Sequence, residues 1–272
     1  MSRVKPSNPV INRSHPLARG LVGAWAFQDG GGSVLRDVSG HGNDGTFVGT
    51  PTWISAERGG ALDFSGSNCI DLGNKADFKP AVNQGISFSA WARPDTVSGN
   101  DFIYGHRYSG GSSAIQLARF GSGFYVLFFS NGRAETAYQT IAGVFAVGVW
   151  VHLVAVRRPD GQIDAYVDGV KTTLGTVCSG AISDQNVSAF IGRHSRSPAS
   201  QDWDGQIQDF RMWSRALADT EVIDLYVGDD LYSPAIDTFE RYYERVPLGA
   251  AGQPAFKRWS QRTNQPIFGR GF

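Results

Sequence analysis

One loop of this 272-residue chain gathers oxygen-bearing residues of the kind that bind calcium. Residues 37–46 read DVSGHGNDGT, in which carboxylate, amide and hydroxyl side chains alternate with glycines. Calcium takes about six to eight hard oxygen ligands, backbone carbonyls among them. Because glycine adopts positive φ at little cost, such a loop can turn its carbonyl oxygens towards one point. The segment predicts either a calcium site or a simple Asx-type turn at Asp37.

The acidic residues are poorly spaced for hydrolysis. Retaining glycosidases need two carboxyl groups about 5–5.5 Å apart, and the nearest candidates are Asp160, Asp164 and Asp168. Asp160 and Asp168 each precede a glycine and are explained as turn formers, which leaves Asp164 alone. His152 lies in an apolar run, where we expect a hydrogen-bonded structural histidine. Since neither a G-x-S-x-G nor a G-x-x-x-x-G-K motif occurs, we expect no enzyme activity.

Sugar binding is a second kind of chemistry that the residues allow. Two segments expected to be loops, 104–111 and 194–203, carry aromatic, histidine and arginine side chains. Loops on a rigid scaffold are where binding residues concentrate. Tyr108 and Trp203 are therefore candidate sugar platforms, and the alternative is that they only cover the edge of the domain.

Short strands must position all of these residues. Residues 86–92 alternate, with Ile86, Phe88, Ala90 and Ala92 on one predicted face. Further runs of strand character, separated by Gly, Ser, Asn or Asp, are residues 21–27, 61–64, 69–72, 102–105, 114–120, 124–130, 150–157, 162–167, 170–173, 189–191 and 205–213. So many short strands with turn residues between them are typical of a sandwich or barrel.

Composition narrows the class of protein further. The formal net charge is zero, so no bulk attraction to nucleic acid or to an acidic membrane is implied. No apolar run is long enough for a membrane helix, and the first twenty residues lack the apolar stretch of a secretory signal. Cys69 and Cys178 are too few for a disulfide framework; two buried thiols or one bridge both stay open.

Six segments, taken in chain order, resemble a laminin-G-like (concanavalin A-like) jelly-roll domain over residues 20–226. They are GLVGAWAFQDG, DVSGHGNDGT, ALDFSGSNCIDLGN, ISFSAWARP, VWVHLVAVRRPDGQIDAYVDGV and DWDGQIQDFRMWSRALADTEV. The resemblance implies an all-β fold, a two-sheet antiparallel jelly-roll sandwich, whose first strand (residues 21–27) lies beside its last (residues 205–213). A short helix is expected over residues 217–226.

The same resemblance implies the ligands of a structural calcium ion that would join the first and last strands. Asp37, Asn43 and Asp209 would contribute side-chain oxygens, and Gly40 and Thr46 their carbonyls. On this interpretation a chelator lowers the melting temperature. On the alternative one, residues 37–40 form only a turn and Asp209 faces solvent.

Both ends of the chain lie outside the resemblance. We expect residues 1–20 to form an extended N-terminal arm, residues 21–226 the jelly-roll domain, and residues 227–272 a C-terminal docking tail. From Arg245 onwards the tail has five basic residues and no acidic ones, with aromatic residues between them. Such a segment either stays disordered or orders on a partner. The residues expected to bind that partner are Phe256, Arg258, Trp259, Arg262 and Phe268.

The two ends also resemble those of tailed-bacteriophage structural proteins. This implies a non-catalytic virion protein, a capsid decoration or other head-surface protein that assembles in the host cytoplasm, forms homo-oligomers and binds a capsid subunit. The alternative is a carbohydrate-binding adhesion module that recognises host or surface glycans.

Overall fold

The computed structural model describes residues 4–65, 67–107, 113–130, 136–182, 186–194, 201–228 and 231–234, and the short strands at 258–259 and 266–267. The chain divides into two compact units, Met1–Ala235 and Ile236–Phe272. In the second unit β19 (Arg258–Trp259) pairs with β20 (Pro266–Ile267), and Phe256, Arg262 and Phe268 lie outside the described residues.

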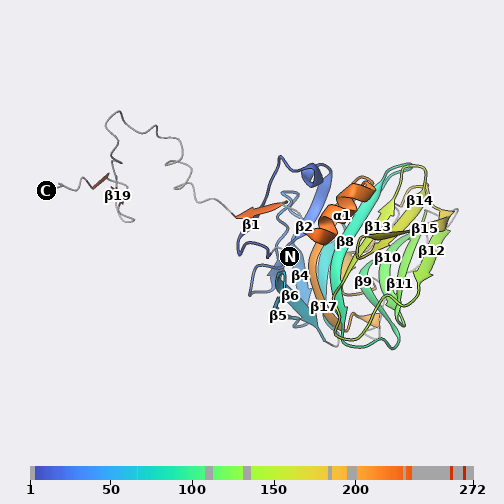
Figure 1. The fold of residues 1–272 in the computed structure, drawn as a ribbon, viewed down its shortest axis with the longest axis horizontal. Helices are drawn as coiled ribbons and strands as arrows, with labels where there is room; N and C mark the ends of the chain where they lie inside the picture. The colour runs from blue at the N-terminus through green and yellow to red at the C-terminus, as the bar shows by residue number, and fades with distance from the viewer. Residues whose placement is uncertain are drawn as a thin grey trace. The chain divides into compact units, whose positions relative to one another are not determined.

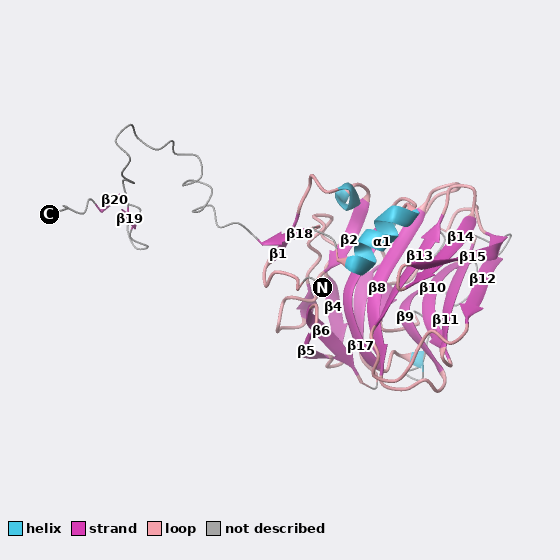
Figure 2. Cartoon of the chain, viewed as in Figure 1, coloured by secondary structure: helices cyan, strands magenta, loops and turns pink. Residues whose placement is uncertain are grey.

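Two large sheets with antiparallel strand pairing form the first unit (Figure 2). The first sheet runs, in spatial order, β12 (Thr136–Ile141), β11 (Gly123–Phe129), β10 (Ala114–Phe120), β9 (Asn100–Arg107), β16 (Ala189–Ile191), β7 (Cys69–Gly73), β4 (Gly45–Val48) and β3 (Val34–Leu35). The second runs β15 (Val170–Val177), β14 (Gln162–Val167), β13 (Val151–Arg157), β8 (Ile86–Pro94), β17 (Gly205–Trp213), β6 (Gly59–Phe64) and β5 (Thr52–Ala56), and β2 (Leu21–Trp25) also pairs with β17. This arrangement confirms the predicted jelly-roll sandwich.

The first and last strands of the sandwich are neighbours, as predicted. β2 pairs antiparallel with β17, with Trp25 opposite Phe210. The register of β17 against β8 shifts between Gln208 and Arg211, where Asp209 has a φ of 56°. This bulge lets β17 pair with β6 along its first part and with β2 along its last.

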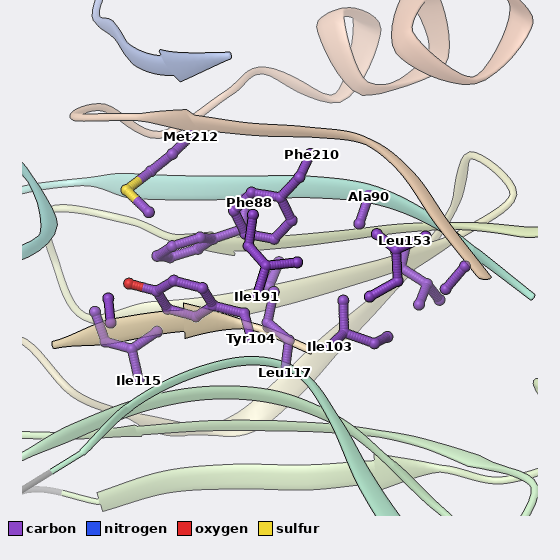
Figure 3. Packing of buried hydrophobic residues seen from close by; sticks show 14 of the residues in the cluster. Phe88, Ala90, Ile103, Tyr104, Ile115, Leu117, Leu153, Ile191, Phe210 and Met212 are labelled. Carbon is purple, nitrogen blue, oxygen red and sulfur yellow. The ribbon is translucent and has the colours of Figure 1, made fainter. Parts of the chain in front are cut away.

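The core lies between the two sheets (Figure 3). Phe88 of β8 packs against Tyr104 of β9 and Phe210 of β17, with ring centroids 5.0 Å and 6.4 Å away. Ile86, Ala90 and Ala92 belong to the same buried cluster, which confirms the face predicted from the alternation of residues 86–92.

A second, smaller core covers the outer face of the second sheet, the one that contains β17. Helix α1 (Asp219–Val227) packs Val222 and Leu225 there, beside Trp213 of β17. The N-terminal arm contributes Leu17, whose carbonyl accepts a hydrogen bond of 2.7 Å from Trp213 Nε1. Because β1 (Pro9–Ile11) also pairs with β18 (Tyr232–Pro234), segments that we expected to lie outside the domain are part of its compact unit.

Both cysteines are buried, and they do not form a disulfide bond with each other. Burial raises the pKa of Cys69 to about 12, so its thiol stays protonated. The helices of the described segments are all too short or too polar to cross a membrane.

Candidate functional site

Asp37 organises the glycine-rich loop through hydrogen bonds. Its Oδ1 accepts from the amides of Ala24 and Ser39 at 2.9 Å and 2.8 Å. Its Oδ2 accepts from the Ser39 hydroxyl at 2.8 Å and from the Asn43 amide at 2.9 Å. Both carboxylate oxygens therefore have protein donors, which is the role of an extended Asx turn.

Asn43 joins this loop to β2 and to the short 3-10 helix Ala76–Phe78. Its side-chain nitrogen donates to the Val22 carbonyl at 2.8 Å and to Asp77 Oδ2 at 3.0 Å. Its own carbonyl accepts from Trp25 Nε1 at 2.9 Å. These hydrogen bonds attach the loop to β2 and to the 3-10 helix.

The other predicted calcium ligands have different surroundings. Asp209 is buried and receives hydrogen bonds of 2.8 Å and 2.7 Å from the Arg211 guanidinium and one of 2.9 Å from the Tyr232 hydroxyl. Although burial opposes ionisation, the charges of Arg211 and Lys5 hold the pKa of Asp209 well below its usual range. Thr46 is exposed on β4, in the other sheet, and Gly40 is exposed with a φ of 92°.

These contacts do not fit one shared calcium site. The structure brings Asp37 and Asn43 together, but their hydrogen bonds described above involve neither Asp209 nor Thr46. A guanidinium, that of Arg13, already donates to the Ser39 carbonyl of the loop at 2.6 Å. Across the described part of the chain, no three His, Cys, Asp or Glu side chains gather to hold a metal. Calcium binding therefore stays a prediction.

One of the two predicted sugar platforms has to be corrected. Trp203 is fully buried and packs its ring 5.9 Å from that of Phe145. It has no free face for a sugar, because a large apolar ring next to a sheet is more favourably buried in the core. Tyr108 lies outside the described residues.

An open groove lies instead on the outer face of the first sheet. Its lining residues belong to the strands β9, β11 and β12, which lie with β10 in one part of this sheet (Figure 1). Its volume is about 250 Å³, and its lining residues are Arg107, Tyr125, Leu127, Phe129, Thr136 and Tyr138. The register places Leu127 opposite Tyr138 and Phe129 opposite Thr136. On β10, Ala114 and Ala118 stand opposite Phe129 and Tyr125. Because their methyl side chains are small, they leave space between the larger side chains on this face.

Aromatic rings dominate the groove. Tyr125 stacks on Phe120 with centroids 4.1 Å apart, and Tyr138 lies 6.4 Å from Tyr125. The Arg107 guanidinium lies over the Phe129 ring at 5.4 Å. Tyr138 is 60% exposed, so its ring face is open to a ligand. Burial raises the pKa of Tyr125, which therefore remains a neutral phenol at physiological pH.

The acidic residues weighed for hydrolysis have structural contacts. Asp160 accepts from the Gln162 amide at 3.0 Å and Asp168 from the His152 amide at 2.8 Å. Asp164 is buried, with Arg158 at 2.5 Å and Lys171 at 3.3 Å. His152 is buried and 2.9 Å from the Ser89 hydroxyl, as expected of a structural histidine.

The chain belongs to the concanavalin A-like lectin/glucanases superfamily, because its residues 64–223 match the Laminin_G_3 family. A comparison with curated proteins gave no match.

Solved structures share the fold at low sequence identity. Domain 4 of AbnA, a GH43 extracellular arabinanase from Geobacillus stearothermophilus solved with arabinotriose, is 21% identical over 76% of this chain and 98% of that one, with a TM-score of 0.57. The binding domain of Paraclostridial Mosquitocidal Protein 1 is 12% identical, with a TM-score of 0.60 over 77% of this chain and 52% of that one. The Botulinum Neurotoxin serotype G binding domain is 14% identical, with a TM-score of 0.58 over 76% of this chain and 50% of that one. The chain thus spans about half the length of these two toxin domains.

Proposed function

We propose that this domain binds carbohydrate and catalyses no reaction. The observation that carries the proposal is the groove on β9 to β12, where Tyr125 and Tyr138 present aromatic surface beside the polar groups of Arg107 and Thr136. Pyranose and furanose rings have apolar C–H faces and hydroxyl edges, so a site for them combines aromatic rings with a few polar groups. The arabinotriose bound to domain 4 of AbnA supports a sugar as the ligand class for this fold.

The absence of catalysis is proposed from the contacts of the acids. Asp164 is neutralised by two cations, and Asp160 and Asp168 hold turns. Among the described residues that line the groove, none carries a carboxylate. General acid catalysis at a glycosidic bond requires a carboxyl group within reach of the leaving oxygen.

Removing the exposed tyrosine is expected to weaken sugar binding. The full chain is first screened on a glycan array that includes arabinotriose, and the bound glycan is then titrated by calorimetry. Tyr138→Ala should raise Kd by about two- to tenfold, since an aromatic contact contributes roughly 0.5–1.5 kcal/mol. Tyr138→Phe, which keeps the ring, should change Kd little.

Val170→Ala is the matched control, because Val170 is 71% exposed on β15 of the other sheet. If Tyr138→Ala binds as the native chain does, the groove is not the site. If the array gives no glycan, carbohydrate binding itself is wrong.

We also propose, on the character of the chain ends, that the domain is carried on a virion as a decoration protein. One observation supports an anchoring role: the β1–β18 pair holds the N-terminal arm beside the segment that leads into residues 235–272. A partner that receives one end of the first compact unit can therefore contact its other end.

Deletion of residues 246–272 tests the anchoring role. We expect the truncated protein to be lost from purified particles, as measured by mass spectrometry. Its melting temperature should stay unchanged, because the compact unit ends at Ala235. Recovery of the truncated protein in particles at the native level would contradict the proposal.

A further inference from the structure

A cavity of about 450 Å³, larger than the groove, lies between the N-terminal arm and the loop that follows β2. The polar residues lining it are Ser7, Asn8, Gln28, Asp29, Ser33 and Arg36. It shares no lining residue with the groove on β9 to β12. Neither the predicted calcium ligands nor the proposed groove uses it.

The backbone at the end of β2 builds this cavity. Phe27 has a φ of 59°, a conformation that is costly for a bulky residue, and it turns the chain away from the sheet. Gly30, Gly31 and Gly32 follow, and a Cβ added to any of them would meet no atom within 4 Å. The chain therefore leaves open space beside this loop.

The arm closes the opposite side. Lys5 Nζ donates to the Ala26 carbonyl at 2.7 Å, next to the turn at Phe27. Further along, β1 is held by its pairing with β18, with Pro9 opposite Pro234. Ser7 and Asn8 lie between these two attachments, so their wall of the cavity is fixed at both ends.

The charges of the residues that line the cavity sum to zero. Asp29 and Arg36 are its only charged residues within the described chain, and their carboxylate and guanidinium groups are 3.7 Å apart. A carboxylate accepts hydrogen bonds and a guanidinium donates them, so the pair offers both functions side by side. In addition, the Gln28 side-chain nitrogen is buried and has no hydrogen-bond partner within the described residues. This nitrogen packs against Gly59, which lies outside the cavity lining, so Asp29 and Arg36 are the groups that offer hydrogen bonds to a ligand.

We infer that this cavity is a second ligand site, which takes a neutral sugar unit with neighbouring hydroxyl groups. One hydroxyl donates to the Asp29 carboxylate, and its neighbour accepts from the Arg36 guanidinium. An anionic ligand is opposed by Asp29 and a cationic one by Arg36, which leaves a neutral polyol as the matching chemistry. Ala26, Val34 and Val38 supply the apolar surface for the ring. The inference does not rest on the proposed groove.

The test is a titration of the ¹⁵N-labelled full chain with methyl α-D-glucopyranoside, methyl β-D-galactopyranoside and methyl α-L-arabinofuranoside, followed by amide chemical shifts. Tetrahydropyran, a ring without hydroxyls, is the control compound. We expect saturable shifts at Gly31, Gly32 and the Gln28 side-chain amide with at least one glycoside, and none with tetrahydropyran.

Two variants assign the contacts. Asp29→Asn and Arg36→Gln should each raise Kd by roughly tenfold, the cost of one charged hydrogen bond. Arg36 has a side chain 78% exposed, so its replacement leaves folding intact. Tyr138→Ala should leave these shifts unchanged, which separates this site from the groove. Any one of four results would overturn the inference: shifts confined to the groove, equal shifts with tetrahydropyran, no shifts at all, or unchanged Kd in both variants.

Discussion

Acidification from pH 7 to pH 5 will lower the free energy of unfolding by roughly 3–4 kcal/mol through two buried histidines. Desolvation by burial lowers the pKa of His106 to about 4 and that of His152 to about 3, from 6.5. The unfolded chain therefore takes up two protons near pH 6.5 that the folded chain does not. Their stabilising contribution is present above pH 6.5 and is lost as the pH falls towards the folded pKa values.

Urea unfolding at fixed pH values between 7 and 5 measures this effect. His106→Gln and His152→Gln should each remove about one proton from the slope of stability against pH. His41→Gln is the control, because His41 is exposed. Equal slopes in the native chain and both buried-site variants would refute the assignment.

Replacing Asp37 by alanine should lower the free energy of unfolding by about 3 kcal/mol. The backbone amides of Ala24, Ser39 and Asn43 all lose their acceptor in this variant. A hydrogen bond to a charged group contributes roughly 1.5–3 kcal/mol. Asp37→Asn keeps one acceptor oxygen and should cost less. Val34→Ala, at a 41% exposed position on the nearby β3, should cost little.

The same variant separates hydrogen bonding from calcium binding. The loss should be equal in calcium and in chelator, because the donors of Asp37 are protein groups. A loss seen only with calcium, together with calorimetric binding of calcium by the native chain, would restore the metal interpretation.

The fold was predictable because its signals are local or ordered along the chain. Alternation in residues 86–92 assigned the buried face of β8, and the family resemblance of six segments in order implied that β2 pairs with β17. The groove was not predictable from sequence in the same way. Residues 123–129 read GFYVLFF, apolar at nearly every position, so the pattern does not distinguish the core face from the face carrying Tyr125, Leu127 and Phe129.

Distant segments decide the surroundings of the predicted site residues, and the sequence does not show these segments. The sequence places Trp203 among polar residues, but it does not show that the ring of Phe145 packs against it. The sequence of the loop at Asp37 shows which residues carry oxygen atoms. It does not show that the backbone amide of Ala24, in β2, donates to Asp37. Asp209 and Arg211 are two residues apart, which places them on one face of a strand, but the sequence shows neither the bulge at Asp209 nor its contact with the Tyr232 hydroxyl.

The pairing of β1 with β18 has a consequence for how the domain is made. Pro9 meets Pro234, so this ribbon cannot form on the ribosome until nearly the whole compact unit has emerged. Contacts of such high sequence separation slow folding, because the chain entropy of a long loop is lost before the contacts form. Once folded, the two ends of the unit lie beside each other. A unit with adjoining ends can be inserted into a surface loop of another protein, or circularly permuted, without rebuilding its sheets.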